Sequence, residues 1–239
     1  MIDSPVVFDS LEYLRINRAR EAWLRRVITL IPFRNELRTA LDVGCGAGYF
    51  SNVLVDLGFS VTGVDLRQSN VEICRQRYPQ CAFLQADLDQ TDALEGKGLA
   101  AHDLALVFGF LYHIQSPLQT IDRLAQHVNR LCIVSTRIAR GDAMACYLYR
   151  ENEGDGQNLK RVVAVPTVPA IINIFAEAGF GFQYQVDPQP DHEQWDPSKT
   201  PDGLRFSFIA SREPMNTAAL RRLRAPKPLQ KWKNHPREA

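Results

Sequence analysis

A short glycine-rich stretch constrains the fold of this chain more than any other part of the sequence. Residues 41–50 read Leu-Asp-Val-Gly-Cys-Gly-Ala-Gly-Tyr-Phe, with three glycines at alternate positions. The apolar residues before the glycines predict a buried strand over 39–43, and those after them predict a helix over 49–56. Glycine permits positive φ and lacks the Cβ that would obstruct a ligand, and the following helix points unpaired N–H groups at the turn. The stretch therefore predicts a ligand-binding turn at the carboxyl end of a first strand, where open α/β sheets bind their ligands.

The spacing of the glycines distinguishes between two kinds of ligand. A dinucleotide-binding turn needs a small residue five positions after the first glycine, but Tyr49 occupies that position. Asp42 would repel a pyrophosphate, whereas it could bind an ammonium group through charge-assisted hydrogen bonds of about 1.5–3 kcal/mol each. A glycine turn without a ligand is the alternative. The cofactor-binding residues expected here are Asp42, Gly44, Cys45, Gly46 and Gly48.

This turn resembles the first motif of the class I S-adenosylmethionine (SAM) methyltransferases, in which an acid precedes three glycines. The resemblance covers about residues 38–211. It implies SAM as the cofactor, with the acid near the amino end of the methionine moiety. It also implies an α/β fold, a Rossmann-like doubly wound sheet of seven strands in the order 3-2-1-4-5-7-6 with the last strand antiparallel.

A second acid ends the next predicted strand, which runs from Phe59 and stops at Asp65, 23 residues after Asp42. A carboxylate at the tip of strand two can accept hydrogen bonds from both ribose hydroxyls, as in nucleotide-binding α/β folds. The alternative role for Asp65 is the N-cap of the following helix. We assign Asp65 and the adjacent Leu66 to the cofactor site.

A third acid follows the predicted strand over 81–86. In the methyltransferases an acid at this place accepts a hydrogen bond from the adenine amino group, and the next backbone N–H serves a ring nitrogen. The resemblance therefore assigns Asp87 and Leu88 to the binding of adenine. Asp89 is the alternative to Asp87 as the carboxylate that accepts from the adenine amino group.

The fourth predicted strand, 103–109, ends where the resemblance places the transferable group of the cofactor. Gly109 is expected to line this site. His113 is a candidate general base, because the pKa of histidine lies near working pH, although a lone histidine is more often structural. Tyr112 is expected to orient a substrate or to shape the methyl channel.

Two further segments resemble the tRNA wobble-uridine carboxymethyltransferase branch of the superfamily. They are Leu-Tyr-His at 111–113 with Ser-Pro-Leu at 116–118, and Asp-Pro-Ser-Lys-Thr at 196–200 followed by Arg205. That branch uses carboxy-SAM, and the resemblance implies that Tyr112 and Arg205 help to hold the extra carboxylate. The large amino-terminal region of the branch and its carboxylate-binding lysine have no counterpart in this sequence, so we take its reaction as the second choice.

Two segments are expected to cover the site. Apolar residues recur at helical spacing within 1–38, which predicts one or two helices. The resemblance implies that this segment packs over the cofactor as a lid, with Tyr13, Arg15 and Arg18 as candidates to face the cofactor or the substrate. A solvated arginine face is the alternative. Residues 137–166 interrupt the alternation of strands and helices. The resemblance implies that an insertion here covers the acceptor pocket as an aromatic hairpin or lid, with Tyr147 toward the substrate, and a surface loop without such a role is the alternative.

Composition limits the remaining possibilities. The 239 residues have a formal net charge of +1 and 45% hydrophobic residues, which is typical of an ordinary globular domain and favours neither RNA nor a membrane as a partner. The five cysteines include no C-x-x-C pair, so we expect reduced thiols, a cytoplasmic location and no metal. Residues 212–239 carry eight basic and two acidic side chains. Such a block permits an RNA contact without requiring one.

The sequence thus predicts a helical cap over 1–38, a SAM-binding domain over 39–211 and a basic, mobile tail over 212–239. We expect a SAM-dependent methyltransferase that acts on oxygen or nitrogen of a small molecule. A tRNA-modifying methyl- or carboxymethyltransferase is the second hypothesis. A SAM-binding subunit without catalysis is the third.

Overall fold

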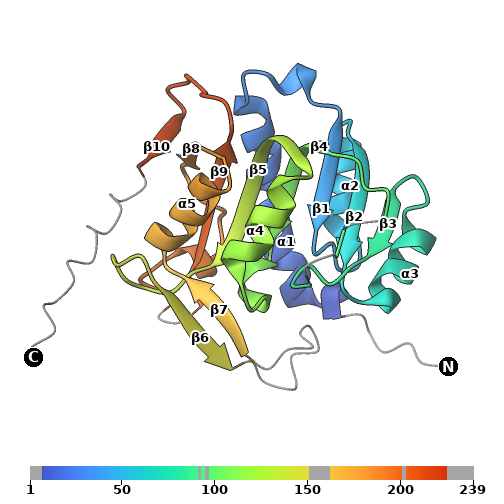
Figure 1. Cartoon of the computed structure of the whole chain (residues 1–239), viewed down its shortest axis with the longest axis horizontal. Helices are drawn as coiled ribbons and strands as arrows, with labels where there is room; N and C mark the ends of the chain where they lie inside the picture. The colour runs from blue at the N-terminus through green and yellow to red at the C-terminus, as the bar shows by residue number, and fades with distance from the viewer. Residues whose placement is uncertain (1–6, 91–92, 95–96, 151–161, 201–202, 225–239) are drawn as a thin grey trace, which may run out of the picture.

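A computed structural model describes residues 7–90, 93–94, 97–150, 162–200 and 203–224. Its centre is an eight-stranded sheet in the order β10-β8-β9-β5-β4-β1-β2-β3 (Figure 1). The strands of this sheet are β1 (Thr39–Val43), β2 (Ser60–Asp65), β3 (Ala82–Gln85), β4 (His102–Phe108), β5 (Val128–Arg137), β8 (Phe182–Val186), β9 (Arg205–Ser211) and β10 (Leu220–Leu223).

The order of the strands confirms the expected Rossmann-like topology. β1 to β5 pair in parallel, and β9 is antiparallel to both of its neighbours, β5 and β8. With β8 and β9 taken as the sixth and seventh strands, the order is 3-2-1-4-5-7-6. We expected the last two strands to form the edge of the sheet, but β10 adds a further strand outside β8.

The first part of the segment expected to be a mobile tail is instead built into the sheet. Leu220–Leu223 pairs antiparallel with β8, and the side chains of Met215 and Leu220 are buried in the core. The Tyr184 hydroxyl accepts a hydrogen bond of 2.8 Å from the Met215 N–H. Burial of these two apolar side chains and the backbone pairing hold residues 215–223 in place, whereas 225–239 lie outside the described residues.

Helices cover both faces of the sheet. The faces are set by the alternation of side chains along each strand. In β4, Leu104 and Leu106 pack toward α1 and α2, while Ala105 and Val107 pack toward α4 and α5. In Figure 1, α4 and α5 lie in front of the sheet and α1 lies behind it. The helices are α1 (Leu11–Leu30), α2 (Tyr49–Asp56), α3 (Gln68–Arg77), α4 (Pro117–Ala125) and α5 (Val168–Glu177), with short 3-10 turns η1 (Val7–Asp9), η2 (Arg34–Glu36), η3 (Leu111–His113) and η5 (Glu193–Trp195).

α1 is one continuous helix and only partly the lid that we expected. The Ser10 side chain caps its first turn by accepting a hydrogen bond from the Tyr13 N–H. Its second half packs Trp23, Leu24 and other apolar side chains against the sheet, as one layer of the core. α1 therefore covers the cavity described below only with its first half.

The insertion after β5 contains the expected hairpin. β6 (Cys146–Arg150) and β7 (Val162–Pro166) pair antiparallel in a separate two-stranded sheet, which extends below α4 and α5 in Figure 1. Every residue of β6 is exposed. Among the described residues, no helix is both long and apolar enough to cross a membrane.

The packing of α1 predicts the effect of truncating its core side chain. Leu24 is fully buried, so Leu24→Ala should lower the free energy of unfolding by about 2–5 kcal/mol through lost burial and a residual cavity. Urea unfolding followed by circular dichroism measures this loss. Leu11→Ala is the matched control on the same helix, because Leu11 is 88% exposed. Equal unfolding midpoints for the two variants would contradict the packing of α1.

Candidate functional site

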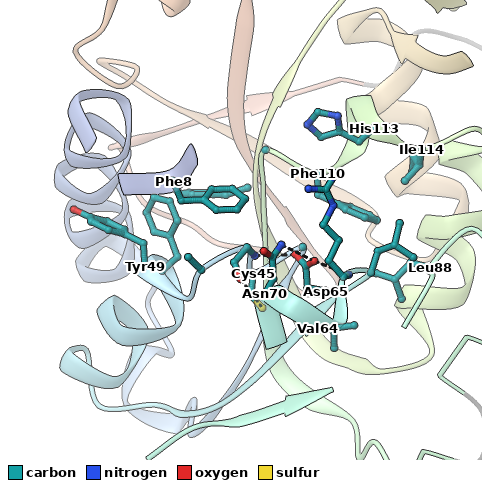
Figure 2. A pocket seen from close by; sticks show the side chains of 18 of the residues that line it. Phe8, Cys45, Tyr49, Val64, Asp65, Asn70, Leu88, Phe110, His113 and Ile114 are labelled. Carbon is teal, nitrogen blue, oxygen red and sulfur yellow. Dashed lines mark hydrogen bonds between the residues drawn. The ribbon is translucent and has the colours of Figure 1, made fainter. Parts of the chain in front are cut away.

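A cavity lies at the carboxyl ends of the parallel strands, as expected for an open α/β sheet. It encloses about 1050 Å³, counting the part that is open to solvent, which suits a small-molecule ligand. The turns after β1, β2, β3 and β4 line it together with the first half of α1. Figure 2 shows Phe8 on one side, Phe110 and Ile114 on the other, and Asp65 with Asn70 at the base.

The glycine turn has the backbone geometry that its sequence predicts. Gly46 has a φ of 54°, and a Cβ on it would lie 2.9 Å from the ring of Phe8. Gly48 has a φ of 85° and caps α2, where a Cβ would meet the Tyr78 ring at 2.7 Å. Side chains at these positions would therefore be strained and would clash. Gly44, Cys45 and Gly46 line the cavity, whereas Gly48 does not.

Asp65 lines the cavity and also holds the turn in shape. Its Oδ2 accepts a hydrogen bond of 2.9 Å from the Gly46 N–H. Its Oδ1 accepts from the Arg67 N–H and from the Asn70 side chain, both at 2.9 Å. The carboxylate thus joins the end of β2, the glycine turn and α3.

Asp42 does not lie where we expected it. It is 2% exposed, it is not part of the cavity wall, and its Oδ2 accepts a hydrogen bond of 2.6 Å from the Ser51 hydroxyl of α2. Burial raises the pKa of Asp42 to about 7, even though the Ser51 hydrogen bond opposes the shift. Direct contact with a ligand in the cavity is therefore not its role in this structure.

The acids after β3 both line the cavity, but they have different surroundings. Asp87 accepts from the Asp89 N–H at 3.1 Å and from the Gln90 side chain at 3.3 Å. Asp89 accepts from the Gln115 N–H at 3.0 Å, so it ties this turn to the segment after β4. Leu88 also lines the cavity. Asp89 thus links the turn after β3 to the segment after β4, whereas these two hydrogen bonds of Asp87 lie within its own turn.

The end of β4 forms the wall opposite the acids. Gly109, Phe110 and His113 line the cavity. Tyr112 is 4% exposed and lies behind this wall, with its ring 4.1 Å from that of His113. The two candidate catalytic residues are thus neighbours, but only His113 belongs to the cavity wall.

Cations surround the Tyr112 hydroxyl. Arg205 donates to it at 3.0 Å, and the guanidinium groups of Arg205 and Arg137 each lie 5.0 Å from the centre of its ring. Burial alone would raise the pKa of Tyr112, but the surrounding cations, led by Arg205, outweigh it and lower the pKa to about 7. Burial and then the charge of Arg205 lower the pKa of Arg20 to about 9. The wall near β4 is therefore strongly electropositive.

Of the remaining predicted cofactor and substrate residues, two line the cavity and two lie outside it. Tyr13 and Leu66 line the cavity. Arg18 is exposed on the outer side of α1 and Tyr147 is 47% exposed on β6, so neither reaches the cavity in this structure. Arg18 lies outside the cavity because α1 turns its opposite face to the core, and Tyr147 lies outside it on β6, a strand whose residues are all exposed.

Several cavity residues were not predicted from the sequence. Arg20 had a usable signal, because it occupies the apolar stripe of α1 three and four residues before Trp23 and Leu24. A charged residue at such a position must be buried. Four further unpredicted residues are aromatic or amide side chains without a distinctive motif: Phe8, Asn17, Tyr49 and Asn70. No group of three or more potential metal ligands occurs among the described residues.

Comparison with known protein families identifies the family of the chain. Residues 15–185 match a family model described as a methyltransferase domain. The chain belongs to this methyltransferase family. The expected membership of the class I SAM methyltransferase superfamily and the expected fold are both confirmed.

Among curated proteins, a tRNA U34 carboxymethyltransferase of Pasteurella multocida is 30% identical over 177 residues. The match covers 70% of this chain and 52% of that protein. A ubiquinone biosynthesis O-methyltransferase of Rickettsia typhi is 32% identical over 124 residues, covering 51% of this chain and 50% of that protein. The chain thus spans about half the length of the curated relatives it matches.

Solved structures resemble the fold at lower identity. The N-terminal domain of EvdMO1 with SAH bound has a TM-score of 0.66 at 18% identity, with 85% of each chain covered. Magnesium protoporphyrin IX methyltransferase from Synechocystis PCC 6803 with bound SAM has a TM-score of 0.58 at 18% identity, covering 87% of this chain and 88% of that one.

The contacts of Asp65 predict a loss of cofactor binding on its removal. Asp65→Ala takes away the acceptor of the Gly46 N–H and a carboxylate of the cavity wall. We expect SAM affinity, measured by calorimetry, to fall by about tenfold or more, the loss expected from one charge-assisted hydrogen bond. Amide exchange at Gly46 should also become faster. Glu72→Ala on the exposed side of α3 is the control, and unchanged SAM affinity in Asp65→Ala would refute the assignment.

The burial of Asp42 predicts a pH dependence of stability. The pKa of Asp42 is raised from 3.8 to about 7, so between these values the folded state binds more protons than the unfolded state. The free energy of unfolding of the wild type should therefore fall, relative to that of Asp42→Asn, as pH rises through this window. The full difference is at most about 4 kcal/mol. Denaturant titrations at several pH values measure it, with Asp56→Asn at an exposed site as the control; parallel curves for wild type and Asp42→Asn would contradict it.

Proposed function

We propose that this chain binds SAM in the cavity and transfers its methyl group to an oxygen or nitrogen atom of a small molecule. The observation that carries the proposal is that the glycine turn, Asp65 and Asp87 line one cavity, beside the carboxyl end of β4. The ends of three separate strands thus place a glycine-rich turn and two carboxylates around the same space. Membership of the methyltransferase family supports the same ligand.

The residues of the cavity fit SAM. The backbone at Gly46 lines the cavity without a side chain, and the Asp65 carboxylate beside it suits ribose hydroxyls. Asp87 and Leu88 offer a carboxylate and an apolar surface to adenine. When bound, SAM supplies a methyl group activated by attachment to a positively charged sulfur.

The chain itself contributes position and proton transfer. Rigid strand ends hold reactants in a near-attack arrangement, which can account for a large part of the rate of a two-reactant transfer. We assign to His113 the removal of a proton from an acceptor hydroxyl or amine, because it lines the cavity at the end of β4. Phe8, Phe108 and Phe110 also line the cavity and limit the access of water to it.

A second function is supported by the curated relatives and by the contact between Arg205 and the Tyr112 hydroxyl. In this alternative the chain transfers a methyl or carboxymethyl group to tRNA. We favour the small molecule because the sequence shows no recognisable RNA-binding module, although the basic residues of 212–239 permit an RNA contact. A cytoplasmic location is part of the proposal, since all five cysteines are free thiols.

Labelled SAM tests the proposal directly. Calorimetry should show binding of SAM and of its demethylated product, but no binding of NAD. Transfer of a labelled methyl group to a cell extract should place the label in small molecules and not in tRNA. NAD binding without SAM binding would refute the cofactor, and label in tRNA would favour the second function.

Substitution of His113 tests the assigned proton transfer. His113→Gln should lower methyl transfer by about 10²–10⁴, the usual contribution of a general base, with SAM affinity unchanged. Single-turnover transfer and calorimetry on the same preparations separate the two quantities. Wild-type transfer rates in His113→Gln would remove this residue from the mechanism.

A further inference from the structure

Three arginines surround the phenol ring of Tyr112. Arg205 of β9 donates a hydrogen bond of 3.0 Å to its hydroxyl oxygen. The guanidinium groups of Arg137 and Arg205 each lie 5.0 Å from the centre of the ring. Arg20 of α1 approaches the same oxygen, since a Cβ on Gly109 would lie 3.5 Å from both Arg20 Nη1 and the Tyr112 hydroxyl. Side chains from α1, β5 and β9 thus place positive charge around one hydroxyl group.

Among the described residues, no acid pairs with the two buried arginines of this group. Arg20 and Arg205 are 4% and 6% exposed, and none of the ion pairs between described residues joins either of them to an Asp or a Glu. A buried charge is strongly destabilising unless an opposite charge lies close to it. Tyr112 is itself 4% exposed, and its hydroxyl oxygen becomes negative when it loses its proton. The phenolate of Tyr112 is therefore the counter-charge within reach of both arginines.

The surroundings of Tyr112 favour this phenolate. Burial on its own raises the pKa of Tyr112. Four positive charges outweigh burial and lower the pKa from 10 to about 7, in decreasing order those of Arg205, His113, Arg20 and Arg137. Burial and the charge of Arg205 lower the pKa of Arg20 to about 9, while the charge of Tyr112 and a hydrogen bond to it act in the opposite direction. Tyr112 and Arg20 therefore stabilise each other in the charged form.

Arg20 transmits this contact to the cavity. Arg20 lines the cavity, whereas Tyr112 lies behind the cavity wall. Arg20 belongs to the first half of α1, the part of the helix that covers the cavity, and it also donates to Asn17 at 3.4 Å. Gly109, at the end of β4, separates Arg20 and Tyr112 from the cavity without a side chain of its own. A charge on Tyr112 therefore fixes the covering helix against the strand end where the acceptor is expected.

We propose that Tyr112 is an anionic positioning residue, whose phenolate holds Arg20 and Arg205 at the wall of the cavity beside Gly109. The sequence assigned Tyr112 to a substrate or to a carboxylate of the donor, whereas in this inference the negative charge belongs to the chain itself. Protonation of the phenol weakens the restraint on α1. The inference rests on the proposed function only where it concerns the cofactor, because the charge of Tyr112 can be measured in the protein alone.

Ultraviolet titration of the protein without cofactor tests the charge. A phenolate absorbs at longer wavelength than a phenol, and burial raises the pKa of Tyr49 and of Tyr78, so their phenolates form only at higher pH. We expect a step of about one of the seven tyrosines near pH 7 in the wild type. Tyr112→Phe should lack this step, and the control Tyr147→Phe on β6, whose ring is 47% exposed, should retain it.

Variants of Arg205 test the cause of the charge without removing the phenol. Arg205→Gln should move the absorbance step to higher pH, because Arg205 is the largest of the charges that lower the pKa of Tyr112. Arg205→Lys should leave the step closer to its position in the wild type, because lysine keeps the charge but lacks the fork of donors.

Calorimetry with SAH on both sides of pH 7 tests the positioning. The neutral phenol and phenylalanine both lack a charge, so the wild type and Tyr112→Phe should bind SAH alike below pH 7. Above pH 7 the wild type should bind about tenfold more tightly or more, the ratio for one charge-assisted hydrogen bond. The comparison cancels the titration of groups that both proteins share, such as Asp42.

Stability gives a second readout. Between about pH 7 and pH 10 the unfolded state binds more protons at Tyr112 than the folded state. The free energy of unfolding of the wild type, relative to that of Tyr112→Phe, should therefore rise with pH through this window.

Three results overturn the inference, and they differ from a failure of the proposed function. The first is that no absorbance step near pH 7 is lost in Tyr112→Phe. The second is a ratio of SAH affinities that is the same above and below the step. The third is that Tyr112→Phe lowers the stability equally at every pH, which would show only packing against Ala139 and Val165. If the wild type binds neither SAM nor SAH, the proposed function and the positioning role fail, while the absorbance step still decides the charge of Tyr112.

Discussion

The hydrogen bonds of one carboxylate set the shape of the cavity. Asp65 accepts from Gly46 in the turn after β1, and from Arg67 and Asn70 at the start of α3. Three of the five residues of the turn are glycines, so neighbouring groups contribute much of what holds its path. The Val64 carbonyl adds to this by accepting from the Gly44 and Cys45 N–H groups at 2.8 and 3.0 Å. Hydrogen bonds to the end of β2 thus fix the backbone conformation of the ligand-binding turn.

The cavity is electrically asymmetric. Asp65, Asp87 and Asp89 lie with Arg67 on the side of β2 and β3, whereas Arg20 and Arg205 lie on the side of β4 and α1. A ligand with hydroxyl and amino groups at one end and an acidic group at the other would be oriented by this asymmetry before any shape-specific contact. Orientation is a precondition for methyl transfer, because the acceptor atom must lie in line with the bond that breaks.

The sequence predicted the parts of this protein that depend on local patterns. The strand order, the glycine turn and the positions of Asp65 and Asp87 follow from alternation, spacing and motif. The position of Asp42 could also have been read from alternation, since Leu41 and Val43 point to the face of α4 and α5 and the residue between them must point to α2. β10 could not be predicted, because four residues with two arginines form a strand only by pairing with β8. The grouping of Arg20 with Arg205 joins residues 185 positions apart and depends on the tertiary fold.

The dual role of α1 has a consequence for how molecules enter and leave. Its second half cannot swing away from the sheet without exposing Trp23 and Leu24, which are among the most deeply buried side chains of the core. A movement of α1 that widens the cavity is therefore confined to the residues before Trp23, where Phe8 and Tyr13 pack edge to face with ring centres 5.3 Å apart. The contact between Phe8 and Tyr13 can open without disturbing the core, while the second half of α1 stays fixed against the sheet.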